Sequence, residues 1–171
     1  IIQDEGGSVK SIAAGASAAG AMVGEASRLS RTPVGIAELI LGTECGGSDA
    51  CSGISANPAL GVASDRLIDA GGSVILAETT ELIGAEHLIA ARAVSPQVSA
   101  RCYEVIRSCE NAAKSMGVDM RGSQPTPGNI EGGLSTIEEK SLGCIYKAGT
   151  KPLQDVIDYA MPVRKKGLVW M

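Results

Sequence analysis

The sequence is poor in aromatic residues, with one Trp, three Tyr and no Phe among 171 residues. Its core must therefore be built from aliphatic side chains. Proteins that bind nucleic acid commonly stack bases on aromatic rings and follow the phosphate backbone with basic side chains. The net charge of −4 and a single short basic run, Arg164–Lys166, supply neither feature. We therefore expect no nucleic-acid partner.

Long apolar runs and paired cysteines are also missing. No apolar stretch approaches the roughly 20 residues of a membrane helix, and the Ala/Gly-rich stretch from Ile12 to Gly24 lacks the charged start of a signal peptide. The five cysteines are odd in number and form no Cys-x-x-Cys, which argues against a disulfide framework or a zinc knuckle. These absences predict a cytoplasmic protein with no membrane partner.

What the sequence does contain is an alternation of helical and strand-like patterns. Apolar residues at helical spacing, together with Gly and Pro breaks, predict helices over residues 9–29, 57–70, 85–93, 95–116, 135–147 and 150–159. Short apolar runs predict strands over residues 36–41, 73–77 and 168–171. This order is typical of an α/β fold with three layers, in which helices cover both faces of a mainly parallel, Rossmann-like sheet.

Start signals and chain ends refine this outline. Asn57-Pro58 and Ser95-Pro96 predict N-caps followed by Pro at the first helical position, and Ser135–Glu138 fits a capping box. The chain begins at Ile without Met and ends on an apolar run that reads as a strand with nothing after it, so both ends look cut. A terminal edge strand is the alternative explanation of the final run. We expect residues 1–171 to form one α/β domain, as a fragment of a longer protein.

The stretch from Glu44 to Pro58 is the first candidate for chemistry. It joins a predicted buried strand to a helix start, where α/β proteins commonly place functional residues. Its reactive side chains are Cys45, Ser48, Asp49 and Asn57, and its Gly pair would let a ligand approach the backbone. A tight turn with a buried cysteine explains the same residues equally well. Residue types alone leave the two interpretations open.

Two further regions carry titratable groups. Glu78 and Glu81 follow the clearest strand, with His87 shortly after, and could bind a metal ion or act as acid and base. Solvated surface residues are the simpler reading there. The Gly/Pro-rich segment around Asn129 leads into Lys140, which could serve as a base only if it is buried. No Gly-x-Gly-x-x-Gly or Gly-Lys-Ser/Thr motif is present, so a nucleotide site is not supported.

Taken in order, these motifs resemble one family. They are Cys45-Gly-Gly-Ser-Asp49 with Ser55-Ala-Asn-Pro58, Glu78-Thr-Thr-Glu81, Thr126-Pro-Gly-Asn129 with Gly132-Gly-Leu-Ser135, and Glu138-Glu-Lys-Ser-Leu-Gly143. The chain from about Glu38 to Met171 is similar to the altronate/galactarate dehydratases, and Gly84-Ala-Glu-His-Leu88 looks more like the altronate branch.

The resemblance implies a function. Members dehydrate sugar acids to 2-keto-3-deoxy acids with a divalent metal, usually Fe²⁺ with Mn²⁺ as an alternative, and the family also contains a sulfolactate sulfo-lyase. It implies a small-molecule sugar-acid partner and a homo-oligomer. Members are longer than this chain, so a non-catalytic fragment that only binds ligand or packs against missing parts is a third hypothesis.

The resemblance also suggests roles for individual residues. The expected metal ligands are Cys45, Asp49 and Glu78. The expected substrate-binding residues are Ser48, Asn57 and Asn129. Glu81, His87 and Lys140 compete for the acid and base roles. If these residues form one site, the loop at 45–49, Glu78 and the segment 127–133 should share one edge of the sheet.

Overall fold

The computed structural model describes residues 2–171, and the contacts divide the chain into two compact units. The boundary falls between Val34 and Gly35. The core and all four strands lie within residues 35–171. The assignment of residues 1–171 to a single domain stays a prediction.

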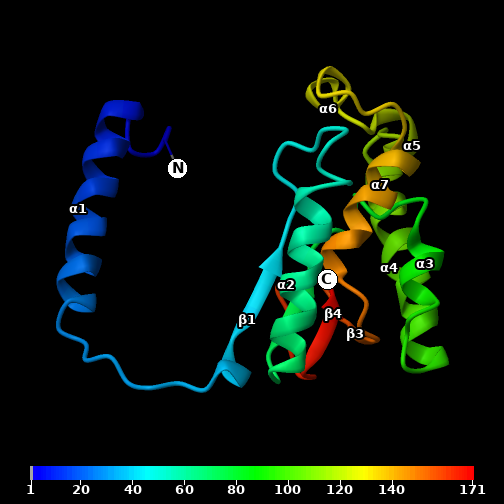
Figure 1. The fold of residues 1–171 in the computed structure, drawn as a ribbon. Helices are drawn as coiled ribbons and strands as arrows, with labels where there is room; N and C mark the ends of the chain where they lie inside the picture. Colours follow the sequence, from blue (N-terminus) through cyan, green and yellow to red (C-terminus); the bar gives the residue numbers. More distant parts are fainter. Residues whose placement is uncertain (1) are drawn as a thin grey trace. The chain divides into compact units, whose positions relative to one another are not determined.

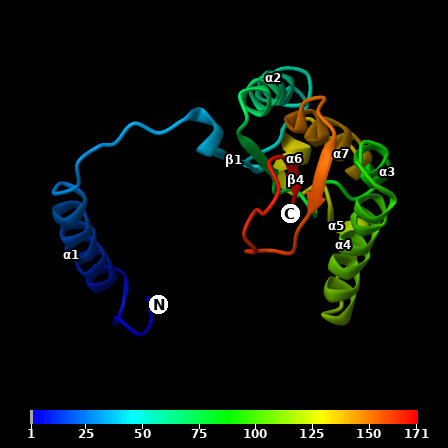
Figure 2. The ribbon, with the colours of Figure 1, turned by 90° about the horizontal axis from the view of Figure 1, so that it is seen from below.

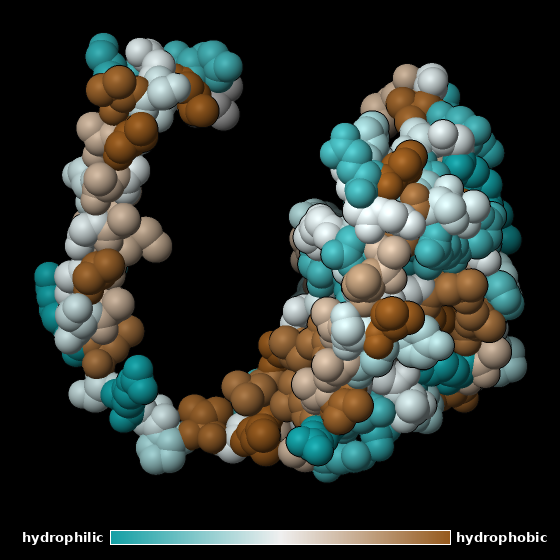
Figure 3. All heavy atoms as spheres, turned by 45° about the horizontal axis from the view of Figure 1, so that its top comes forward, coloured by the Kyte–Doolittle hydropathy of each residue, from teal (hydrophilic) through white to brown (hydrophobic). Residues whose placement is uncertain are grey.

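The first unit is dominated by one helix, α1 (Ser8–Ala26), as the apolar periodicity predicts (Figure 1). None of its residues is buried, and Val9, Ile12 and Met22 are each at least 70% exposed. Figure 3 shows these hydrophobic patches on its surface. The predicted helix is therefore confirmed, and its apolar side chains are exposed.

The second unit contains a four-stranded parallel sheet. Its strands are β1 (Ile40–Thr43), β2 (Ser73–Leu76), β3 (Leu153–Val156) and β4 (Gly167–Trp170), in the order β1-β2-β4-β3 (Figures 1 and 2). The predicted α/β class with a parallel sheet is confirmed. The last strand is not an edge strand, because β4 pairs with β2 on one side and β3 on the other.

Helices surround this sheet. They are α2 (Ala56–Asp69), α3 (Glu86–Ala90), α4 (Pro96–Ser115), α5 (Met120–Ser123), α6 (Pro127–Glu131) and α7 (Ile137–Ile145), with 3-10 turns η1 (Ile36–Glu38) and η2 (Tyr146–Ala148). Helix α2 packs against β2 and η2, and α4 packs against β3. No described helix is both long and apolar enough to cross a membrane.

One core, aliphatic except for the fully buried Trp170, joins the sheet to the helices. Register places Val74 beside Leu168 and Leu76 beside Trp170, so these side chains form rows on one face of the sheet. The core adds side chains from other elements: Leu82, Ile83, Ile89, Val98, Cys102, Ile106, Ile137, Cys144 and Leu153. Cys102 is fully buried. All five cysteines are free.

The predicted helix over residues 150–159 is wrong. Residues Leu153–Val156 form β3, which pairs with β4 in parallel register. Leu153 and Val156 are buried while the two residues between them are half-buried. Pairing with a strand that lies more than ten residues further along the chain decides the conformation here, and local propensity does not record such a contact.

Helix starts show one confirmation and two corrections. Ser95 caps α4, because its Oγ accepts a hydrogen bond from Val98 N at 3.3 Å. Asn57 is not an N-cap: α2 begins one residue earlier, and the Asn57 side chain points elsewhere. The cap of α7 is Thr136 rather than Ser135, with Thr136 Oγ1 accepting from Glu139 N at 3.1 Å.

Glycines let α2 and the α7–η2 segment touch backbone to backbone. A Cβ added at Gly61 would lie 2.1 Å from the carbonyl oxygen of Tyr146, and one at Gly53 would lie 2.9 Å from Gly143 Cα. Asn57 Nδ2 reinforces the contact by donating to Gly143 O at 2.9 Å. This packing fixes α7 relative to the loop that follows β1.

Candidate functional site at the carboxyl ends of the strands

The carboxyl ends of all four strands open onto one cavity of about 430 Å³. The residue directly following each strand lines it: Glu44 after β1, Ala77 after β2, Ile157 after β3 and Met171 after β4. Ligands of open α/β sheets bind outside the carboxyl ends of the strands. The topology therefore marks this cavity as a candidate active site.

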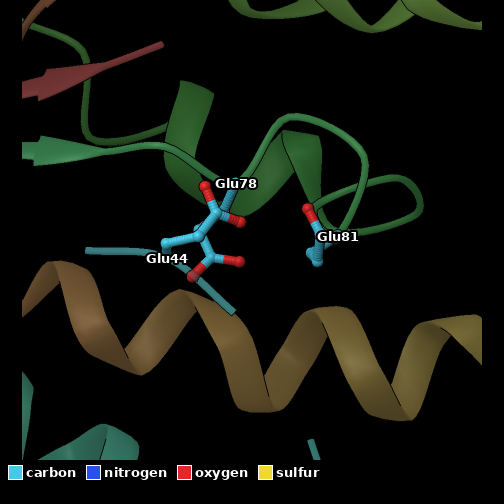
Figure 4. A group of neighbouring side chains, drawn as sticks. All are labelled: Glu44, Glu78 and Glu81. Atoms are coloured by element: carbon cyan, nitrogen blue, oxygen red, sulfur yellow. The ribbon is translucent and has the colours of Figure 1, made fainter. Parts of the chain in front are cut away.

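Three carboxylates follow β1 and β2, and two of them, Glu44 and Glu81, line the cavity. Ligand oxygens of Glu44, Glu78 and Glu81 all lie within 4.8 Å of one another. Figure 4 shows the three side chains as neighbours. Glu44 is exposed, Glu81 is half-buried and Glu78 is completely buried. Oxygen donors of this kind suit hard divalent cations such as Mg²⁺ and Mn²⁺. The donor set thus fits a divalent cation.

Glu78 is anchored by two residues of the α7–η2 segment. Lys147 Nζ forms a very short ion pair with Glu78 Oε1, and Cys144 Sγ donates to Oε2 at 2.9 Å. Burial raises the pKa of the Glu78 carboxyl, against the opposing effect of these two donors. Burial is the largest single effect and acts to lower the pKa of the Lys147 ammonium group, but the hydrogen bond to Glu78 and the nearby negative charges together outweigh it, so that the pKa is raised. The two together form a buried ion pair.

Burial together with the adjacent Glu78 carboxylate raises the pKa of the Cys144 thiol far above its usual range. Cys144 is therefore a neutral hydrogen-bond donor to Glu78. A thiolate nucleophile at this position is excluded at ordinary pH.

Lys147 and Cys144 were not among the predicted site residues, yet the sequence carries a signal for them. Lys140, Cys144 and Lys147 follow a spacing of i, i+4 and i+7, which places them on one helix face. Ile137 and Ala148 on the same segment are buried core residues. Two lysines on the inward face of a helix are unusual, because lysine is rarely buried unless it is paired.

The predicted metal ligands are not all brought together. Cys45 lies within hydrogen-bonding distance of Ser48, at 2.5 Å between Sγ and Oγ. Asp49 accepts bonds from Ser52 N and Ser52 Oγ, and these bonds lower the pKa of its carboxyl. Among the described residues, the groups able to share a metal contain Glu78 but neither Cys45 nor Asp49. The metal role of these two residues stays a prediction.

The predicted substrate-binding residues mainly hold segments together. Asn57 is bound to α7, as described above. Asn129 Nδ2 donates to Ser48 O at 3.0 Å, and its Oδ1 accepts from Thr126 N and Thr126 Oγ1. Ala50 N also donates to Gly132 O at 3.0 Å. These bonds place the loop after β1 against the segment around α6, as the convergence prediction requires.

The predicted acid and base residues lie in different environments. Glu81 belongs to the carboxylate group and accepts a hydrogen bond from Thr80 Oγ1. His87 is exposed on α3. Lys140 is buried on α7 and lines a second cavity of about 160 Å³ with Ser48, Asp49 and Asn57. Their catalytic roles stay predictions.

Comparison with known proteins gives a consistent assignment. Residues 36–171 match the family described as D-galactarate/Altronate dehydratase, C-terminal. The chain is 42% identical over 133 residues to a galactarate dehydratase (L-threo-forming) of Escherichia coli, covering 78% of this chain and 25% of that protein. It is 42% identical over 138 residues to an altronate dehydratase of Bacillus subtilis, covering 81% and 28%.

The name of a third relative indicates a different activity. The chain is 44% identical over 148 residues to the (2R)-sulfolactate sulfo-lyase subunit beta of Chromohalobacter salexigens, covering 85% of this chain and 38% of that protein. The chain thus spans between a quarter and two fifths of the length of these relatives. The family match covers well over half of the chain, and it includes every strand and every side chain of the strand-end site. The chain belongs to the D-galactarate/altronate dehydratase family.

Proposed function

We propose that this chain forms part of a metal-dependent hydro-lyase that converts a sugar acid such as altronate or galactarate to its 2-keto-3-deoxy acid. The observation that carries the proposal is that Glu44, Glu78 and Glu81 converge at the strand ends of this chain. The chain belongs to a family of dehydratases. The proposed cofactor is a divalent cation, Fe²⁺ or Mn²⁺, held by these three carboxylates.

The reaction removes the proton next to the substrate carboxylate and expels the neighbouring hydroxyl group as water, so that the enol product becomes the 2-keto acid. Proton removal builds negative charge on the substrate carboxylate, and a bound divalent cation would supply the electrostatic stabilisation that this charge needs. Glu81 lines the cavity, and it offers one oxygen to the proposed cation. Its second carboxylate oxygen is the proposed base that accepts the proton.

The buried pair of Glu78 and Lys147 supports this site. A carboxylate without solvent contact holds its position only when its oxygens are satisfied, and here Lys147 and Cys144 satisfy them. Glu78 is thereby fixed in orientation before a cation or substrate arrives. Such preorganisation lowers the free-energy cost of assembling the charged site.

A second candidate function is elimination of sulfite from sulfolactate. The observation that favours it is the 44% identity to the sulfo-lyase subunit, which extends over 148 residues. Both reactions begin with proton removal next to a carboxylate and differ in the group that leaves from the neighbouring carbon. The same carboxylate site could therefore serve either reaction.

An assay with three substrates tests both candidates. The protein is incubated with D-altronate, D-galactarate or (2R)-sulfolactate in the presence of Fe²⁺ or Mn²⁺, and 2-keto acid and sulfite are measured separately. Formation of 2-keto acid from a sugar acid supports the dehydratase, and release of sulfite supports the alternative. Absence of both products with every substrate and metal contradicts both.

Metal binding is tested independently of turnover by titrating the metal-free protein with Mn²⁺. Glu44→Gln and Glu81→Gln each remove one proposed ligand, and Glu104→Gln on the exposed face of α4 is the matched control. We expect the first two variants to bind Mn²⁺ at least 10- to 100-fold more weakly, the approximate loss known for outer-shell partners. Equal affinity in all three variants would reject the carboxylate site.

A further inference from the structure

Helix α7 and the adjoining turn present two buried lysines with very different partners. Lys147 has the buried carboxylate of Glu78. Lys140 is 7% exposed, and its Nζ donates to two neutral amide oxygens, Gln124 Oε1 at 2.9 Å and Asn129 Oδ1 at 3.1 Å. None of the ion pairs found in residues 2–171 includes Lys140.

A buried ammonium group without a counter-charge is costly, because neutral acceptors replace only part of the hydration that the charge loses. An ammonium group also has three N–H donors. The two amide oxygens account for two of them. Lys140 thus lacks both an anionic partner and one acceptor.

The missing partner has a place to bind. Lys140 lines the cavity of about 160 Å³ beside α7, together with Ser48, Asn57 and Gly143. The cavity has space for roughly five water molecules at about 30 Å³ each, or for the carboxyl end of a small acid. It opens between the loop after β1 and helix α7, both of which carry motifs of this family.

Two carboxylates also line this cavity, but each is already bound to its own segment. Asp49 accepts from Ser52 N and Ser52 Oγ, at 2.7 and 2.9 Å. Glu139 accepts from Ser135 N and Ser135 Oγ, at 2.8 and 2.6 Å. Both residues are exposed. Neither carboxylate therefore supplies the counter-charge of Lys140.

The surroundings also hold the ammonium group in place. Asn129 binds Lys140 through Oδ1, and its Nδ2 is tied to Ser48 O in the loop after β1. This chain of contacts fixes the lysine before any ligand arrives, which reduces the ordering cost of binding. A lysine held rigidly at the wall of a cavity is suited to binding an anion. It is less suited to the role of an acid or base that must move during the reaction.

We propose that Lys140 binds, in this cavity, one carboxylate group of an organic diacid such as galactarate, namely the carboxylate remote from the one that would face the cation. The choice of a hydroxy acid as the ligand rests on the proposed function, whereas the anion site itself rests on the contacts of Lys140. Lys140 is thus a substrate-binding residue that replaces the acid or base role expected for it.

The test measures binding of galactarate to the metal-free protein in EDTA by isothermal titration calorimetry. Galactitol, which keeps the secondary hydroxyl groups and carries hydroxymethyl groups in place of both carboxylates, is the uncharged comparison ligand. The variants are Lys140→Met, which removes the charge at similar volume, and Lys140→Arg, which keeps it. Lys114→Met on the exposed side of α4 controls for loss of one positive charge. Thermal unfolding of each variant shows whether it is folded.

We expect galactarate to bind the wild type and Lys114→Met equally, and galactitol to bind much more weakly. Lys140→Met should bind galactarate roughly 10- to 100-fold more weakly, the value of a charged hydrogen bond, while Lys140→Arg retains part of the affinity. The unfolding temperature of Lys140→Met should equal or exceed that of the wild type, because an unpaired buried charge is removed.

Three results would overturn the inference: no binding of galactarate to the wild type, equal binding to Lys140→Met, or a lowered unfolding temperature of Lys140→Met with unchanged affinity. The outcome is separable from that of the proposed function. Binding that depends on Lys140 without turnover in any metal leaves the anion site standing and rejects the dehydratase. Turnover with an unchanged KM in Lys140→Met does the reverse.

Discussion

At the scale of single residues, Glu78 and Lys147 depend on each other. Both are nearly inaccessible to solvent and form an ion pair. Lys147→Met would leave the Glu78 carboxylate buried without a cation, which typically costs about 3–5 kcal/mol. We expect the free energy of unfolding in urea to fall by this amount.

The matched experiment is the double variant Lys147→Met with Glu78→Leu. Because it removes both charges together, its stability should recover most of the loss seen in Lys147→Met alone. If the free energy of unfolding of Lys147→Met lies within about 0.5 kcal/mol of the wild-type value, the change is no larger than that of a typical surface substitution. The pair would then contribute no more than a surface contact.

Asp49 gives a prediction in pH. Hydrogen bonds from Ser52 lower the pKa of its carboxyl below the ordinary value of 3.8. A lowered pKa in the folded state stabilises the protein above pH 3.8, and this contribution is lost as the pH falls through the lowered value. We expect Asp49→Asn to reduce stability at pH 6 and to abolish this part of the acid loss.

The check is urea unfolding of wild type and Asp49→Asn at several pH values from 6 down to 3. The two curves of stability against pH should approach each other as the pH falls. Parallel curves would show that the carboxylate does not favour the folded state. Asp158→Asn, an exposed carboxyl whose partner is on the surface, provides a comparison for loss of one negative charge.

At the scale of elements, the contact of α2 with η2 depends on a residue without a side chain. A Cβ at Gly61 would approach the backbone oxygen of Tyr146 to 2.1 Å. Gly61→Ala should therefore destabilise the protein by roughly 1–3 kcal/mol, the usual cost of overpacking. Gly128→Ala in α6 is the control, because a Cβ there meets nothing within 4 Å. Thermal unfolding of both variants distinguishes steric overlap from a general effect of glycine replacement.

The elements also show what a sequence can and cannot predict. β2 was predicted within one residue, because Val74 and Leu76 sit in a short run of β-branched and apolar residues that follows a Gly pair and ends before Glu78. β3 was mistaken for a helix, because its partner β4 is distant in sequence and only pairing reveals the strand. Secondary structure follows local signals until a long-range contact overrides them.

The same distinction applies to the candidate site. The family resemblance led us to expect the loop at 45–49 and Glu78 at one edge of the sheet, and the structure places Glu44, directly before that loop, beside Glu78. Nothing local in the sequence shows that the Nδ2 groups of Asn57 and Asn129 donate to Gly143 O and Ser48 O, respectively. Hydrogen-bond partners across 80 or more residues are set by tertiary packing.

At the scale of the whole molecule, the two compact units differ in what they bury. All members of the hydrophobic core belong to residues 74–170, and no residue of α1 is buried. We expect a protein shortened to residues 35–171 to unfold at the same temperature as the full chain, within a few degrees. Circular dichroism measures both midpoints. A clear drop in the shortened protein would show that α1 contributes to the core.

Lys140 and Lys147 lie on one continuous helical segment, so their positions along the chain are coupled. Inserting a single residue between them would turn one part of the segment by about 100° relative to the other. One ammonium group would then leave its pocket while the other stayed in place. The number of residues between the two lysines therefore determines whether both ammonium groups reach their partners at the same time.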